Sequence, residues 1–339
     1  MAITQLNQKQ LEDNNFNYGL ARNAIINGNF DVWQRGVTLT TTTGGYIADR
    51  WTNIVATSST VISQQAFTLG QTDVPNEPKY FHRSVVTSTA GATNRSAFGQ
   101  YIEGVRTFAG QKVTLSFWAK ADANKNIALE FFQNFGNGGS PSSAVFGIGS
   151  QLIALTTSWV KHNITVDIPS ISGKTLGTSS DLLGLLFWFD AGSSFNTRSA
   201  SLGQQSGTFD IAQVQLCAGD VALPFMPKSF EEELRACRRY LRPLPQGEYR
   251  SQLYAASVIH FNIPTGEQMR DTTLVLTATA ETVGWAVYKT DTTLQTGFTI
   301  ALGITDSHGI YLNMSKTSHG LTDAVLNINT NTNFLSAEL

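Results

Sequence analysis

The sequence predicts an all-β chain: a jelly-roll β-sandwich, then one short helix, then a second, smaller β-sandwich. Two observations favour this fold. Short runs in which apolar and polar residues alternate recur along the chain, which is the period of a strand with one buried face. Segments rich in Gly, Ser and Asn separate these runs, as NFGNGGSPSS from Asn134 does, and such segments are typical of exposed loops.

Four runs carry the strand prediction for the larger sandwich. In KVTLSFWAKA, from Lys112, the Val, Leu and Phe share one face and Trp118 falls on the other. WVKHNITVDI from Trp159 and GTFDIAQVQL from Gly207 alternate in the same way. LLGLLFWFD from Leu182 is apolar on both faces, which predicts a central strand of a two-layer stack.

One helix is clearly marked, in SFEEELRACRRYLRP. Ser229 and Glu232 form a capping box, acids fill the first turn, arginines fill the last, and Pro243 follows. Beyond it, short β-branched and aromatic runs such as TLVLTATA predict the second sandwich. The predicted organisation is an attachment or trimerisation segment, a jelly roll, a connecting helix and a C-terminal sandwich, at residues 1–21, 22–228, 229–242 and 243–339.

Composition excludes several classes of partner. The 339 residues hold 23 basic and 25 acidic side chains, a net charge of -2, so nothing favours nucleic acid or an anionic membrane. Only 14% of residues are charged, so the polar surface is built from uncharged groups. Such a surface suits a neutral partner such as a sugar, and it equally suits an ordinary uncharged β-rich shell.

Targeting signals and cysteines add little. The first twenty residues lack a signal-peptide core, and no later run has the roughly 18 apolar residues of a membrane span, which predicts synthesis in a cytoplasm without membrane insertion. Cys217 and Cys237 cannot form a disulfide framework. They are interpreted as buried thiols, with a single disulfide as the alternative.

The sequence gives no basis for an enzyme. A glycosidase needs two facing carboxylates, and the candidate acids stand singly, with no two of them on one strand face. The five histidines show neither a Ser-His-Asp order nor metal-ligand spacing. We therefore expect a protein that binds without catalysing a reaction.

Four motifs carry a resemblance to a known group. They are NAIINGNFDVWQRG from Asn23, GYIADRW from Gly45, FDIAQVQLCAGDVA from Phe209 and FEEELRACRRY from Phe230. In this order they resemble bacteriophage tail-fibre and receptor-binding proteins, over residues 22–242. The inner part, residues 22–222, is similar to a carbohydrate-binding jelly roll.

The resemblance implies a location, partners and a function. It implies a virion protein of the tail, assembled in the host cytoplasm, that attaches the particle to host surface polysaccharide. It also implies a homotrimer that contacts other tail or baseplate proteins. The alternative is a structural virion component, such as a capsid decoration protein.

The resemblance also implies a structural calcium ion. In carbohydrate-binding modules an acid after the opening Asn-Gly and an acid of the closing strand help to hold this ion. Carried over, these positions are Asp31 and Asp210, and oxygen ligands of this kind suit calcium. The alternative is that Asp31 and Asp49 pair with arginines at the strand edges, namely Arg35 and Arg50.

Aromatic residues supply the glycan-binding candidates, because the C–H face of a sugar packs well on a ring. Trp118 is the first choice, with Tyr101 and Phe131 on neighbouring strands, against the alternative that these rings are simply core. His308 and His319, in the predicted tip loops TDSHG and SKTSHG, are further candidates.

Positive charge concentrates around the predicted helix, at Arg235, Arg238 and Arg239. One interpretation is a subunit interface of the trimer. The other is that these arginines oppose the helix dipole and pair with the glutamates of the first turn.

Overall fold

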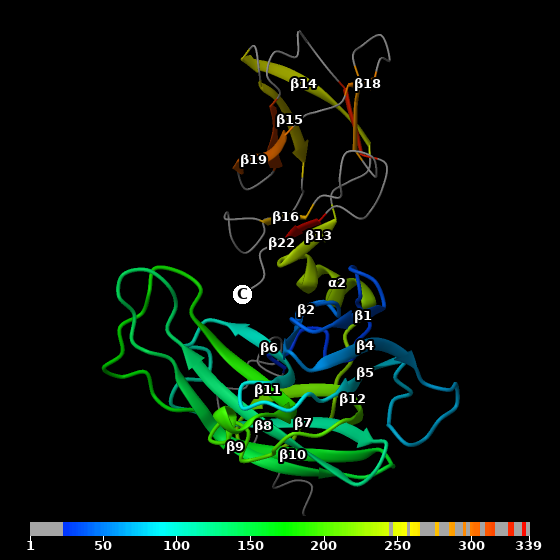
Figure 1. The fold of residues 1–339 in the computed structure, drawn as a ribbon, viewed down its shortest axis with the longest axis vertical. Coiled ribbons are helices and arrows are strands. Elements are labelled where there is room, and N and C mark those ends of the chain that lie inside the picture. The colour runs from blue at the N-terminus through cyan, green and yellow to red at the C-terminus, as the bar shows by residue number, and fades with distance from the viewer. Residues whose placement is uncertain are drawn as a thin grey trace, which may run out of the picture. The chain divides into compact units, whose positions relative to one another are not determined.

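The computed structural model describes residues 23–243 throughout and, beyond them, the backbone of the strands β14 to β22 (Figure 1). The chain divides into two compact units, residues 1–230 and 231–338, which are described separately. The predicted segment 1–21 lies outside the described residues. The predicted all-β fold is confirmed, because nearly every described element is a strand.

Two six-stranded antiparallel sheets form the first unit. Sheet A has the order β1-β4-β5-β12-β7-β10, with bounds Thr38–Thr41, Ser59–Ala66, Tyr80–Thr87, Gly207–Ala218, Lys112–Ala121 and Val160–Asp167. Sheet B has the order β2-β3-β6-β11-β8-β9, with bounds Gly45–Tyr46, Trp51–Ala56, Arg95–Glu103, Leu182–Ala191, Lys125–Asn134 and Val145–Leu155. A short 3-10 helix, η1 (Ser193–Phe195), follows β11. The late strand β12 lies between β5 and β7 (Figure 1), so distant parts of the sequence meet in sheet A.

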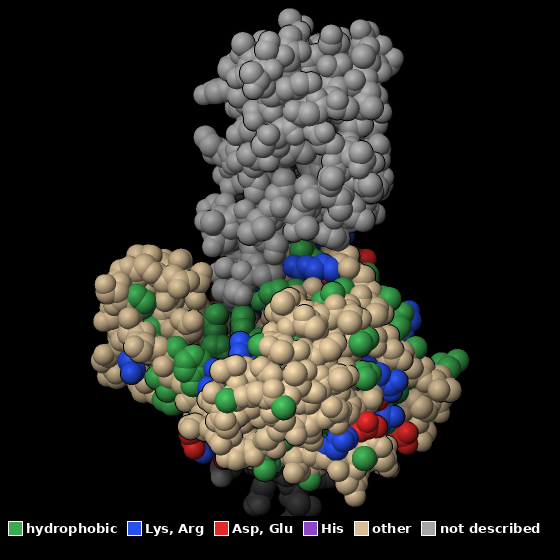
Figure 2. Space-filling view, in the orientation of Figure 1, with side chains coloured by type: hydrophobic (Ala, Val, Ile, Leu, Met, Phe, Trp, Pro, Cys, Tyr) green, Lys and Arg blue, Asp and Glu red, His purple; other side chains and the backbone are tan. Residues whose placement is uncertain are grey.

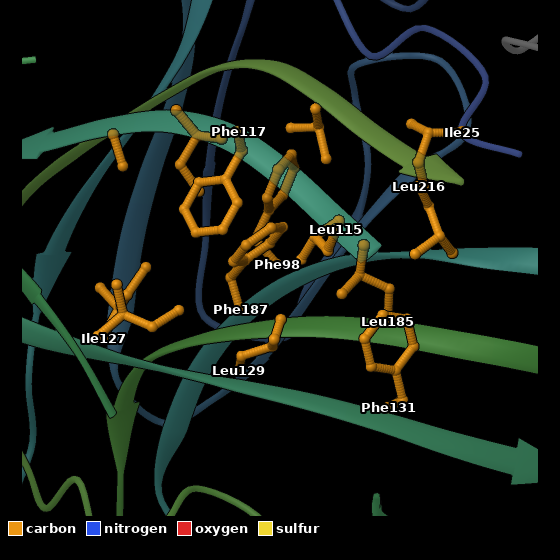
Figure 3. Close-up of a cluster of buried hydrophobic side chains, with 14 of the residues drawn as sticks. Ile25, Phe98, Leu115, Phe117, Ile127, Leu129, Phe131, Leu185, Phe187 and Leu216 are labelled. Carbon is orange, nitrogen blue, oxygen red and sulfur yellow. The ribbon is translucent and has the colours of Figure 1, made fainter. Parts of the chain in front are cut away.

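The core lies between the two sheets (Figure 3). Leu115 and Phe117 point inward from β7, as the alternation predicts, and Phe98, Leu185 and Phe187 meet them from sheet B. The rings of Phe117 and Phe187 are edge to face, with 4.9 Å between their centroids. Each such ring, once removed from water, contributes roughly 1.5–3 kcal/mol to folding.

Strand β11 is buried on both faces, as its continuous apolar run predicts. Its inner residues join the core. Its outer residues, Leu182, Leu186 and Trp188, join a second apolar cluster that includes Phe195 and Leu202 from the segment after β11. A strand needs apolar residues on both faces only when something covers its outer face, and here that is the segment carrying η1.

The opening motif forms a buried turn that ties the chain's start to its last large strand. The Asn27 side chain donates to the carbonyls of Val32, at 2.8 Å, and Asp49, at 3.0 Å. The Val214 backbone N–H donates to the Gly28 carbonyl at 2.9 Å. A Cβ at Gly28 would lie 2.1 Å from the Val214 carbonyl oxygen, so only glycine permits this close approach.

The second unit opens with the predicted helix, α2 (Phe230–Arg238), which has acids in its first turn and arginines in its last. A three-stranded sheet has the order β13-β22-β16, with bounds Leu241–Pro243, Phe334–Ser336 and Val275–Thr277. A seven-stranded sheet has the order β18-β17-β21-β14-β15-β20-β19, with bounds Leu294–Gln295, Trp285–Tyr288, Val325–Ile328, Gly247–Ala255, Val258–Pro264, Gly309–Ser315 and Thr299–Thr305. Within the described part of the chain, no helix has the length and apolarity to cross a membrane.

Candidate functional site

The outer face of sheet B carries a group of aromatic rings, which we call the ring platform. Its members come from β6, β8, β9, β11 and η1, and they are Tyr101, Phe132, Phe146, Trp188 and Phe195. Centroid distances are 5.9 Å between Tyr101 and Phe132, 5.4 Å between Phe132 and Phe146, and 5.2 Å between Trp188 and Phe195. These contacts form two groups of rings, Tyr101–Phe132–Phe146 and Trp188–Phe195.

The platform is apolar, and its members differ in how far they are open to solvent. Hydrophobic side chains gather in a hollow at the left of the first unit, next to the region that Figure 1 labels β6 (Figure 2). The small residues Ala97 and Gly99 precede Tyr101 on the same face of β6. Phe146 is 48% exposed, so its ring is open to a binding partner. Trp188 and Phe132 are only 1% and 7% exposed, so Phe146 is the ring of the platform that is most open to solvent.

A buried ion pair lies beside the rings of the platform. The Arg198 Nε donates to Glu130 Oε1 at 2.8 Å, and the two side chains are 25% and 0% exposed. Glu130 also accepts hydrogen bonds from Trp188 Nε1, at 3.0 Å, and from the Gly147 backbone N–H, at 2.8 Å. One carboxylate thus joins β8, β9, β11 and the segment after η1, which holds these parts of the site in place.

The same arginine covers several rings of the platform. Its guanidinium carbon lies 4.1 Å from the centroid of Phe146, 5.2 Å from Trp188 and 5.9 Å from Phe132. These are cation–π distances, and a guanidinium in this position keeps N–H donors at the edge of an apolar surface. Rings for stacking and donors for hydroxyl groups therefore lie side by side.

A second arginine, Arg95, begins strand β6. Its guanidinium carbon lies 5.0 Å from the Phe195 centroid, and its NH1 donates to the Thr93 carbonyl at 3.3 Å. Burial, and then the charge of Arg198, lower the pKa of Arg95. Burial raises the pKa of Tyr101, so its hydroxyl is neutral at pH 7 and can both donate and accept hydrogen bonds.

The structure separates the predicted glycan-binding residues. Trp118 is half-buried on the outer face of sheet A, opposite Ala212 and Lys161. Tyr101 belongs to the ring platform of sheet B. Phe131 is 0% exposed in the main core, so its prediction as a ligand-contacting ring is wrong. Residue parity explains this, because Phe131 and its neighbour Phe132 point to opposite faces of β8.

Other predicted residues stay untested. His308 and His319 lie outside the described residues. Arg235 and Arg238 are exposed on α2, and Arg239 follows the helix, also exposed, so a subunit interface there remains a prediction. Cys217 and Cys237 are both buried, and they are not joined in a disulfide.

The predicted calcium ligands, Asp31 and Asp210, each have protein partners, and a calcium site at these residues stays a prediction. Arg83 donates hydrogen bonds to both carboxylate oxygens of Asp210, from Nε to Oδ1 and from NH2 to Oδ2, each at 2.7 Å. The Lys120 Nζ lies 3.8 Å from Asp210 Oδ2. Asp31 accepts from the Asn29 side chain at 2.9 Å, and burial raises the pKa of its carboxyl. Among the residues that the structure describes, no group of three or more His, Cys, Asp or Glu could hold a metal.

Asp49, Arg35 and Arg50, which belong to the alternative pairing, make further contacts at the edge of sheet B. Asp49 accepts from the Gln34 backbone N–H at 2.9 Å and also from the Gln34 side chain. Arg50 donates to the Tyr101 carbonyl at 2.6 Å, and Arg35 lies over the Tyr46 ring at 5.4 Å. These contacts help to fasten the edge of sheet B.

The structure also brings together residues that the sequence analysis did not select, namely Phe132, Phe146, Arg198 and Glu130. The parity of β8 was available in the sequence, since Glu130 and Phe132 alternate with core residues. Arg198 had no local signal, because it lies in a polar segment 68 residues from its partner Glu130.

The sequence matches no family model and no curated protein. Its structure is similar to a carbohydrate-binding module of family CBM4, at 16% identity and a TM-score of 0.32, covering 57% of this chain and 98% of that one. It is also similar to the CBM22-1 xylan-binding domain of Paenibacillus barcinonensis Xyn10C, at 14% identity and 0.30, covering 54% and 95%. A third similar structure is the enzymatically active domain of bacteriophage CBA120 tailspike protein 4, at 13% and 0.33, covering 58% of this chain and 21% of that one.

Proposed function

We propose that this chain is a glycan-binding protein and that the ring platform of sheet B is its binding face. The exposed Phe146 ring, flanked by the Arg198 guanidinium at 4.1 Å, carries this proposal. Sugars present apolar C–H faces and polar hydroxyl edges, and this surface offers a partner for each. The neutral Tyr101 hydroxyl adds a donor and an acceptor on the neighbouring side of the platform.

We further propose that the protein is a receptor-binding component of a phage tail that binds surface polysaccharide without cleaving it. The four motifs from Asn23 to Tyr240 support this role through their resemblance to tail-fibre proteins. In a homotrimer, three copies of a weak site on one particle would raise the apparent affinity far above that of one site. Asp190 is a buried acid of β11. It accepts hydrogen bonds from Ser58, Ser88 and the Gln205 backbone N–H, so we assign it a structural role.

The test is binding of the purified chain to a panel of surface polysaccharides. Phe146→Ala should weaken binding about tenfold, which corresponds to about 1.4 kcal/mol. Val85→Ala is the matched control, because Val85 is 38% exposed on a strand of sheet A. Equal loss in both variants, or no binding by the parent chain, would overturn the proposal. Release of reducing ends would show that the protein is an enzyme.

A further inference from the structure

The charges around the ring platform do not balance. Arg95 and Arg198 are the two cations, and both interact with Tyr101 and with each other. Glu130 neutralises Arg198 at 2.8 Å and is fully buried. In residues 23–243, no carboxylate lies within 4.0 Å of the Arg95 guanidinium, whose hydrogen bond is to the Thr93 carbonyl at 3.3 Å. The platform therefore carries one positive charge, that of Arg95, with no carboxylate partner among residues 23–243.

Arg95 is also held in place. Its guanidinium lies 5.0 Å from the Phe195 ring, and Phe195 in turn packs on Trp188 at 5.2 Å. The side chain is only partly exposed, so it does not behave as a freely solvated surface arginine. Because burial and Arg198 both disfavour its charge, an anion bound beside it would gain more than at an ordinary surface site.

From this arrangement we infer that the ligand of the ring platform is an acidic glycan, whose sugar rings carry carboxylates. This inference rests on the proposed function. A planar carboxylate matches the fork of N–H donors on a guanidinium, and charge-assisted hydrogen bonds of this kind are about twice as strong as neutral ones. The sugar rings would lie on Phe146 and Tyr101, and one carboxylate would reach Arg95.

The size of the platform fits a chain of sugars. Arg95 and Tyr101 lie on the same face of β6, six residues apart, which is about 20 Å along an extended strand. Ala97 and Gly99 lie between them. A Cβ at Gly99 would lie 2.0 Å from the Leu185 carbonyl oxygen and 2.5 Å from Leu186 Cδ2, so only glycine fits between these neighbours. An oligosaccharide rather than a single sugar can span this distance.

The experiment uses the full chain and pairs of polymers that differ only in charge. Polygalacturonate and alginate are each compared with their carboxyl-reduced forms by calorimetry at low salt. We expect at least tenfold tighter binding to the acidic form, and we expect added salt to weaken that binding alone. Arg95→Gln should remove the preference and retain the binding to neutral polymer. Lys161→Gln, which removes an exposed cation from sheet A, should change neither.

Each outcome has one meaning. Equal affinity for the charged and reduced polymers would overturn the inference and leave the proposed function standing. A preference for acid that survives in Arg95→Gln would also overturn it, provided that thermal unfolding shows the variant to be folded. If no glycan of either panel binds, the proposed function itself fails.

Discussion

The two outer faces of the sandwich use the same kinds of side chain in different ways. On sheet A, Phe67, Phe81 and Trp159 pack on one another with centroids 4.8 to 5.3 Å apart, and Arg83 is fully paired with Asp210. On sheet B the Phe146 ring is exposed, and Arg95 lacks a carboxylate partner within residues 23–243. A face that satisfies its own charges stabilises the fold, whereas a face that leaves rings and donors open is suited to a ligand.

The largest effect is expected at Glu130, which supports the binding face. Glu130→Gln would leave Arg198 with a neutral partner in a buried site and would weaken the bonds from Trp188 and Gly147. We expect the free energy of unfolding to fall by about 3 kcal/mol. Urea unfolding measures this fall, and Asp73→Asn, in an exposed loop, is the control. A variant as stable as the parent would show that the ion pair does not hold the platform together.

The next effect is expected at His82, which lies in the core and on neither outer face. Burial lowers the pKa of His82 to about 3, whereas an unfolded histidine has a pKa of about 6.5. As the pH falls below 6.5 the unfolded chain binds a proton that the folded chain does not, so stability falls until about pH 3. From pH 6.5 to 4.5 this loss is about 2.3 kcal/mol. The free energy of unfolding of His82→Gln should vary less with pH over this interval than that of the parent chain. An unchanged variation would contradict the lowered pKa of His82.

A smaller effect is expected for the paired charges of sheet A. Asp210→Asn would weaken the grip of Arg83 and cost about 1 to 2 kcal/mol of stability, since Arg83 is about one-third exposed. Glycan affinity should not change, because this pair lies on the other sheet. Loss of glycan binding in a folded Asp210→Asn variant would indicate that the binding site lies on sheet A.

The smallest effect is expected at Trp118. Trp118→Ala should change glycan affinity by no more than about twofold, because its ring lies on the outer face of sheet A. The same titration used for Phe146→Ala measures this. A tenfold loss would restore Trp118 as the principal binding ring.

Much of the fold could be predicted from the sequence, but less of the site. Alternation placed Leu115 and Phe117 inside and Trp118 outside, and the double apolar run placed β11 in the centre of its sheet. The same rule is ambiguous where two aromatic residues are adjacent, which is why Phe131 was selected and Phe132 missed. Arg198 could not be found, because only the folded chain brings its polar loop to Glu130.

The central claim is that sheet B, and not sheet A, binds the ligand. The most direct test is amide hydrogen exchange of the full chain with and without a bound polysaccharide. We expect slower exchange in β6, β9 and the segment around η1, where the ring platform lies. Slower exchange confined to β5, β7 and β10 of sheet A would contradict the claim and assign binding to the opposite face.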